Sequence, residues 1–101
     1  MPIDDRCADY LALPRCEREA LFLDVLKTPP FRTKGSWGEW FHAWLEDQCA
    51  EGRWLGEIAR RIDLPVYYDD GGIDSWQFLE RHVCWLISQG YARVVRVQII
   101  A

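Results

Sequence analysis

Apolar residues recur at helical spacing in the middle of the chain and again near its end. In the first of these stretches Ser36 and Glu39 form a capping box, and Gly52 is a suitable end point. The pattern therefore predicts a helix over 37–51. One stripe of this helix, which we interpret as its core-facing side, consists of Trp37, Trp40, Phe41, Trp44, Leu45 and Gln48.

Two further helices follow from the same periodicity. A short helix over 53–62 is expected to end at Leu64-Pro65, because proline interrupts helical hydrogen bonding. The last helix begins at Asp74, whose carboxylate can cap the first turn with Gln77 completing the box, and it ends at Gly90. The side chains expected in the core are Leu55, Ile58, Ala59 and Ile62 from the short helix and Phe78, Leu79, His82, Val83, Leu86 and Ile87 from the last one.

The two ends of the chain predict a helix and a strand. A helix over 15–27 is expected because Pro14 suits a first turn, apolar residues follow at helical spacing, and Pro29-Pro30 stops it. Residues 91–100 are rich in β-branched side chains and predict a strand. Its candidate partner is 66–68, since strand amides and carbonyls need hydrogen bonds. Without that pairing, the exposed edge would favour a homodimer, for which the N-terminal helices are a second candidate surface.

The run FHAWLEDQCAEGRWLGEIARRIDLP…SWQFLERHVCWLISQGYARVVRV, roughly residues 40–97, resembles the winged helix-turn-helix family of bacterial regulators. The resemblance implies a positioning helix over 56–65, a recognition helix over 75–89, and an exit into the wing at Gly90-Tyr91. The implied fold class is mainly α with a small β element: a winged-helix-like bundle of four or five helices plus a C-terminal strand. We expect one domain over 1–101, with 1–34 as a helical extension and 36–101 as the core. A weaker resemblance to small helical bacterial domains of the YozE type covers 37–62.

A DNA-binding role of this kind would use polar side chains of the last two helices and the strand. Gln77 and Arg81 lie one turn apart on the predicted recognition helix and suit adenine and guanine edges. Cations nearby could neutralise phosphates. The predicted nucleic-acid-binding residues are Arg60, Arg61, Gln77, Arg81, Arg93 and Arg96. The alternative is a set of ordinary solvated charges, since Glu57 can pair with Arg60 and Arg61 on one helix face.

Two features depart from the family pattern. The connection VYYDDGGI is longer than the family's usual one and places Asp69, Asp70 and Asp74 beside the recognition helix, where they would repel phosphates. After Gly90 the chain has eleven residues without Gly, Asn, Asp or Pro to turn them, so the wing is reduced to a single strand.

Charge and composition keep a second function open. The net charge is −4, which is not the balance of a dedicated nucleic-acid binder, and six tryptophans in 101 residues suit a binding surface as well as a core. The alternative is therefore an acidic protein-protein interaction module, or a phage- or plasmid-type inhibitor that imitates DNA to block a host nucleoprotein complex such as a defence system. Its partner-binding residues would be Tyr67, Tyr68, Asp69, Asp70 and Trp76.

Spacing argues against the metal and catalytic sites that the residue types suggest. Counting from Asp69 or Asp70 puts a glycine third and a basic residue twelfth, which does not fit a calcium loop. No C-x-x-C or H-x-x-x-H pair marks a zinc site, and His42 and Cys49 lie two turns apart on one helix. We expect no enzymatic activity, cofactor or metal. The absence of a signal-like start or a long apolar run favours a cytoplasmic protein with reduced thiols and no membrane contact.

Overall fold

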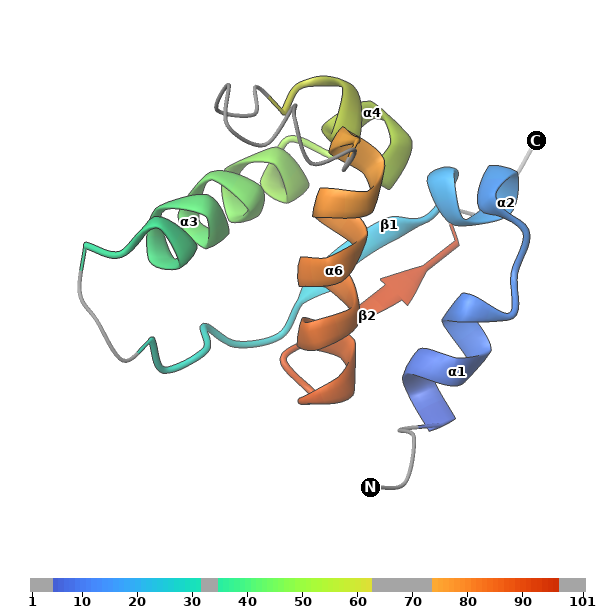
Figure 1. Ribbon diagram of the computed structural model, residues 1–101, viewed down its shortest axis with the longest axis horizontal. Coiled ribbons are helices and arrows are strands. Elements are labelled where there is room, and N and C mark those ends of the chain that lie inside the picture. Colours follow the sequence, from blue (N-terminus) through green and yellow to red (C-terminus); the bar gives the residue numbers. More distant parts are fainter. Residues whose placement is uncertain (1–4, 32–34, 63–73, 97–101) are drawn as a thin grey trace.

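The chain folds into a mainly helical protein with one small antiparallel sheet, as the computed structural model shows (Figure 1). The structure describes residues 5–31, 35–62 and 74–96. This architecture confirms the predicted fold class, mainly α with a small β element. In chain order the described elements are α1 (Asp5–Leu11), α2 (Arg15–Glu19), β1 (Phe22–Val25), α3 (Trp37–Ala50), α4 (Leu55–Arg60), α6 (Ser75–Ser88) and β2 (Ala92–Val95).

The sheet joins two segments that lie far apart in the sequence. β1 pairs antiparallel with β2, so that Leu23 lies opposite Val94 and Val25 opposite Ala92. These four side chains share the inner face and belong to the core or pack against it. The outer face carries Phe22 and the ion pair of Asp24 with Arg93, whose Nε lies 2.9 Å from the carboxylate.

The pairing corrects one sequence prediction and gives the C-terminal strand a partner that was not predicted. The helix expected over 15–27 ends at Glu19, and the chain continues as a strand in which buried Leu21 and Leu23 alternate with half-buried Phe22. That alternation has the period of a strand, and the β2 ladder decides between the two patterns that the short segment allows. The strand expected after Gly90 is confirmed, but the partner found for it is β1, whereas the candidate 66–68 lies outside the described residues.

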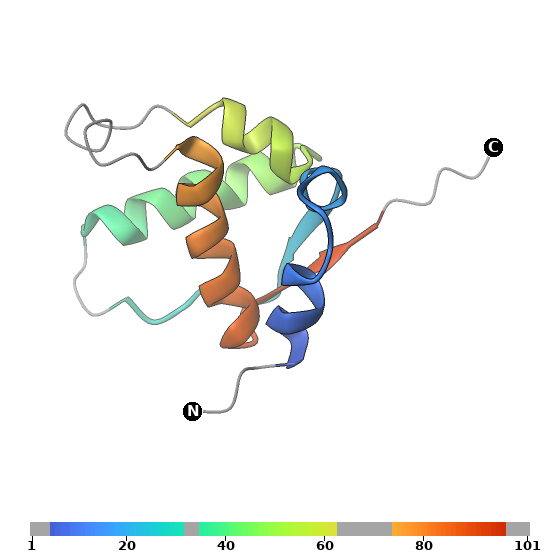
Figure 2. The same cartoon turned by 45° about the vertical axis from the view of Figure 1, so that its right-hand side comes forward.

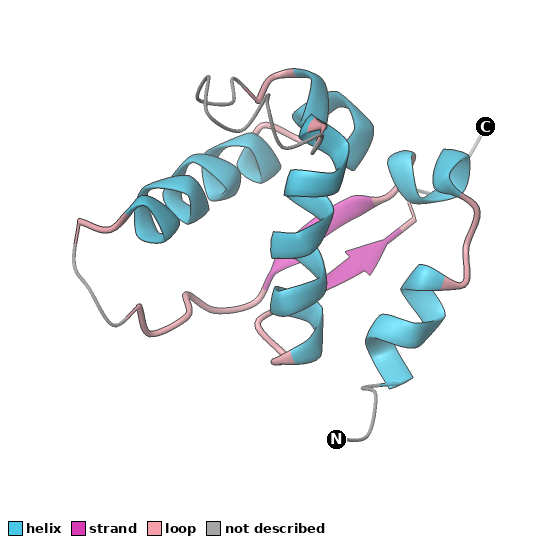
Figure 3. Ribbon diagram, in the orientation of Figure 1, coloured by secondary structure: helices cyan, strands magenta, loops and turns pink. Residues whose placement is uncertain are grey.

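Helix α6 lies at the centre of the fold. In Figure 1 it passes in front of the strands, between α3 and α1, and Figure 3 shows the sheet behind it in the same view. Figure 2, turned by 45°, shows the strands beside α6. Its buried residues are spaced three and four apart, so they form one side of the helix. This side packs against the sheet, α1 and α4. The buried side chains of α6 are Trp76, Leu79, Val83, Leu86 and Ile87.

Capping groups fix the helix ends where the sequence predicts them. Ser36 Oγ accepts a hydrogen bond from the Glu39 amide at 3.3 Å, and Asp74 Oδ1 accepts one from the Gln77 amide at 2.8 Å. Gly90 has a positive φ of 76°, and the next amide, that of Tyr91, donates to the carbonyl of Leu86 at 2.8 Å. This left-handed turn closes α6 and directs the chain into β2.

The buried side of α3 differs from the predicted stripe. Phe41, Leu45 and Gln48 are buried as expected, but Trp40 is 60% exposed and His42 takes a place in the interior at 1% exposure. His82 of α6 is a hydrogen-bonding partner for His42. The buried side of α3 therefore includes a histidine, whereas one indole of the predicted stripe is exposed.

Candidate functional site

The exposed side of α6 and the residue that caps its C-terminal end provide four exposed side chains at intervals of four. None is acidic. The acid within α6, Glu80, is already paired: it accepts a hydrogen bond from the Tyr10 hydroxyl at 2.9 Å and forms an ion pair with Arg18. We name this row the α6 stripe. It consists of Gln77, Arg81, Trp85 and Gln89.

Two more cations lie at the end of α4, which packs against α6. Arg60 and Arg61 are exposed, and Arg60 lines a shallow hollow together with Asp74 and Ser75 at the start of α6. No ion pair among the residues described involves Arg60, Arg61 or Arg81. Their charges are therefore available to an anionic ligand. Two acids line the same hollow as Arg60: Glu19 and Asp74, whose carboxylate already accepts from the Gln77 amide.

Two arginines at the C-terminal strand do not join this group: Arg93 within β2 and Arg96 directly after it. Arg93 pairs with Asp24, and Arg96 lies 3.8 Å from the carboxylate of Glu17. Because Ala92 and Val94 point toward the core, Arg93 between them points to the opposite face of the sheet, away from α6. The six residues predicted to bind nucleic acid thus divide into an α4–α6 group and a pair of already compensated charges.

Of the residues predicted to bind a protein partner, the structure describes Trp76 alone. Trp76 is only 5% exposed and carries the guanidinium of Arg15 over its ring at 5.6 Å. Its ring is a core side chain beside Arg15 of α2, and its contact with a partner stays a prediction. Tyr67, Tyr68, Asp69 and Asp70 lie outside the described residues.

A pair of histidines links α3 to α6, with His42 buried and His82 half-buried. The sequence pattern did not predict this pair. His42 Nδ1 and His82 Nε2 lie 3.1 Å apart. His42 Nε2 is 2.8 Å from Glu46 Oε1, an ion-pair distance, although the contact does not have the geometry of a hydrogen bond. The nearby carboxylate favours a proton on His42 Nε2, so His42 Nδ1 accepts from His82 Nε2–H.

Aromatic rings enclose this pair, and burial favours the neutral form of His82. Phe41 stands edge-on to His82 at 5.1 Å between ring centroids, and Phe31 lies 5.6 Å from His42. Burial, followed by the proximity of His42, lowers the pKa of His82 from 6.5 to about 4. The sequence contained a signal for each histidine. His82 lies on the predicted apolar side of its helix, and His42 directly follows Phe41, which lies on the apolar side of the other helix. What periodicity cannot give is which two helices face each other.

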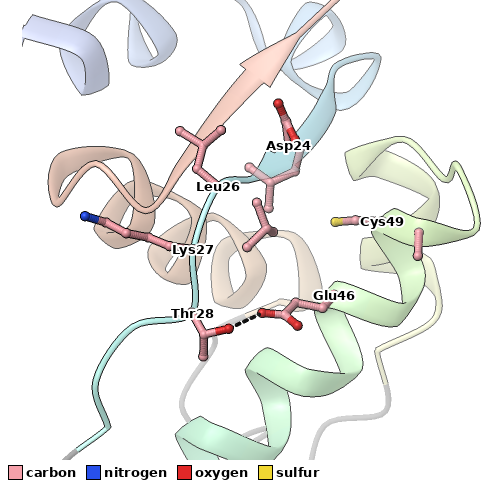
Figure 4. Close-up of a pocket in the computed structure, with 9 residues that line it drawn as sticks. Asp24, Leu26, Lys27, Thr28, Glu46 and Cys49 are labelled. Carbon is pink, nitrogen blue, oxygen red and sulfur yellow. Dashed lines mark hydrogen bonds between the residues drawn. The ribbon is translucent and has the colours of Figure 1, made fainter.

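A polar hollow of about 420 Å³ lies on the other side of Glu46, between α3 and the chain that leaves β1 (Figure 4). The Thr28 hydroxyl donates to Glu46 at 3.2 Å, Cys49 points into the space, and Lys27 points away from both. Burial and the carboxylates of Glu46 and Asp24 raise the pKa of Cys49 to about 11. The thiol is therefore protonated at neutral pH, which disfavours a role as nucleophile.

The cysteines and acids do not form a metal centre in the part of the chain that is described. No three His, Cys, Asp or Glu side chains there are arranged to hold a metal ion. All four cysteines are free, and the thiol of Cys84 shares a hydrogen bond with that of Cys7. Burial is the first cause that raises the pKa of Cys84, to about 12, so this thiol is also protonated.

The fold and the exposed groups define a small, mainly α protein with a two-stranded sheet and a helix that presents a row without acids. No family model matches the chain, no curated protein matches it, and no solved structure matches it. None of the described helices is long and apolar enough to cross a membrane.

Proposed function

We propose that the protein is a non-enzymatic DNA-binding module of the transcriptional-regulator type, in which α6 acts as the recognition helix. The observation that carries the proposal is the α6 stripe: an exposed row without a carboxylate, in a chain with sixteen acids and twelve bases. Gln77 and Arg81 provide hydrogen-bonding groups suited to base edges. The winged-helix resemblance assigns the same helix to recognition, and a cytoplasmic location suits this role.

Arg60 and Arg61 supply the phosphate contacts in this proposal. They stand at the end of α4, which packs against α6. Two phosphate contacts are few, so affinity is modest and strongly dependent on salt. With two phosphate contacts, the logarithm of the binding constant falls with a slope of roughly −2 against the logarithm of salt concentration.

A pair of matched double variants tests the proposal. Arg60→Ala with Arg81→Ala removes two charges from the α4–α6 group, whereas Arg93→Ala with Arg96→Ala removes two charges that are already paired. Measured by fluorescence anisotropy with mixed-sequence duplex DNA at low salt, the first pair should abolish most of the binding. The salt slope should also become shallower by about 1, because Arg60 contacts a phosphate whereas Arg81 contacts a base.

The control has the same net charge as the test variant, so it separates a local face from general attraction. The Arg93 and Arg96 variant should bind DNA within about twofold of the parent, because those arginines lie with Asp24 and Glu17. Equal losses in both variants, or no duplex binding by the parent at low salt, would refute the proposal.

A second candidate function is an acidic protein-binding module, of the kind that could inhibit a host nucleoprotein complex. Exposed tryptophans favour it, since Trp40 is 60% exposed and Trp54 is 44% exposed, and tryptophan is enriched at the centre of protein interfaces. Its test is the capture of a basic partner, which Asp69→Ala with Asp70→Ala should abolish while stability hardly changes. Retention of the partner by that variant would remove the acidic-mimic version. Homodimerisation stays a prediction, for which sedimentation velocity is the direct measurement.

A further inference from the structure

The aromatic member of the α6 stripe belongs to a row of rings at the surface. Trp85 is 40% exposed, with its ring centroid 6.1 Å from that of Phe31 and 5.8 Å from that of Tyr91. The neighbouring rings hold the indole in place from the segment after β1 and from the start of β2. Trp85 is therefore a positioned aromatic surface, and fixing it in advance lowers the entropy lost when a ligand binds.

Cations stand at both ends of this row. Arg81 precedes Trp85 by one turn, about 6 Å along the helix axis. On the other side, Lys27 Nζ lies 5.4 Å from the centroid of Tyr91, and Figure 4 shows Lys27 pointing away from Glu46 and Cys49. Within the described chain neither Arg81 nor Lys27 takes part in an ion pair. The surface thus runs from one cation, over the exposed ring of Trp85 and the half-buried ring of Tyr91, to a second cation.

This alternation fits an unpaired nucleotide better than a base pair. In duplex DNA the faces of the bases are stacked on one another, and a protein in a groove meets only their edges. An exposed indole between two cations would then have no stacking partner. In a single strand each base can offer its face to an aromatic side chain while the backbone follows positive charges. Gln77 and Gln89, at the two ends of the stripe, add amides for base edges without adding negative charge.

We infer that the α6 stripe binds single-stranded nucleic acid, with one unpaired base stacked on Trp85 and the adjoining phosphates held between Arg81 and Lys27. The inference rests on the proposed function, because it uses α6 as the nucleic-acid-binding helix, and it names the form of nucleic acid preferred. Charge complementarity selects this occupant, since Arg81 and Lys27 flank the ring of Trp85 and no member of the α6 stripe is acidic, although the chain as a whole is negative.

Three labelled ligands of equal length test it by fluorescence anisotropy at one low salt concentration. They are an oligothymidylate of about ten nucleotides, an abasic oligonucleotide with the same phosphates, and a mixed-sequence duplex. The parent protein should bind oligothymidylate at least about tenfold more tightly than the abasic strand, because only the former can stack. It should also prefer oligothymidylate to the duplex.

Variants of Trp85 then assign the stacking to one ring. Trp85→Ala should weaken oligothymidylate binding about tenfold and leave abasic binding unchanged. Trp40→Ala is the matched control, because it removes an indole of α3 that is more exposed than that of Trp85. It should leave the affinities for oligothymidylate and for the abasic strand unchanged. Since Trp85 also supports its neighbours, Trp85→Phe provides a variant that keeps a ring; it should retain most of the preference for oligothymidylate.

The outcomes separate this inference from the function on which it rests. Equal affinity for oligothymidylate and the abasic strand, or a duplex bound more tightly than the single strand, would overturn the inference and leave the proposed DNA binding standing. Failure of all three ligands to bind would overturn both. Polyglutamate that competes as well as oligothymidylate would also overturn the inference, since it would make the surface a site for acidic protein segments.

Discussion

The buried histidine pair should make the protein lose stability in mild acid, and substitution of His82 should remove much of that loss. His82 is held neutral by its surroundings, with a pKa lowered from 6.5 to about 4. In the unfolded chain the same imidazole takes up a proton near pH 6.5. The contribution to stability is therefore complete above pH 6.5 and is lost as the pH falls through the folded-state pKa.

The magnitude follows from the width of that interval. Each pH unit between 6.5 and about 4 costs the folded state about 1.4 kcal/mol relative to the unfolded one, which gives about 3 kcal/mol in all. A loss of this size is a large fraction of the total stability of a small domain.

The measurement is urea unfolding of the parent and of His82→Gln at several values between pH 7.5 and pH 4. Glutamine keeps a donor for His42 Nδ1 but does not titrate, so the variant should show a flatter dependence on pH. The carboxyl groups titrate in both proteins, so their contributions cancel in the difference between the two stability profiles. If the two proteins lose the same stability over this range, or if the His82 resonances titrate near pH 6.5 in the folded parent, the reasoning is refuted.

Two packing predictions concern the helix ends and a close helix contact. Asp74→Ala should lower the free energy of unfolding by about 1 kcal/mol in urea denaturation, because the Gln77 amide loses its 2.8 Å acceptor; an unchanged midpoint would contradict this role. Gly56→Ala should destabilise by about 1–3 kcal/mol, since a Cβ there would lie 2.9 Å from the Glu19 Cβ. Gly38→Ala is its control, because the nearest atom would be a Phe31 carbon at 3.7 Å, and its melting temperature should not fall.

Local rules predicted the helix ends, whereas long-range pairing could not be predicted. The caps at Ser36 and Asp74 and the turn at Gly90 depend on neighbours within a few residues, and all three are found in the structure. The segment 21–25 reads equally well as a helix or a strand when taken alone. It becomes β1 because β2, far along the chain, supplies its hydrogen bonds.

The candidate site shows the same division. Gln77 and Arg81 were correctly expected to share one face of a helix, because that follows from a spacing of four residues. The compensation of Arg93 by Asp24 was not predictable, since it arises across the sheet. The histidine pair was also missed because its two members belong to helices whose mutual orientation is a tertiary property. For the same reason, the exposure of Trp40 follows only from the packing of α3 against α6.

The antiparallel pairing of β1 with β2 has a consequence for the order in which the protein can fold. Asp24 and Arg93, which meet on this sheet, are 69 residues apart in the sequence. During synthesis β1 emerges early and β2 is the last of the described elements, so the backbone groups of β1 wait for their partners while α3, α4 and α6 form. Until then its edge is open to pairing with other nascent chains, and a shortened chain that ends at α6 would keep that edge permanently.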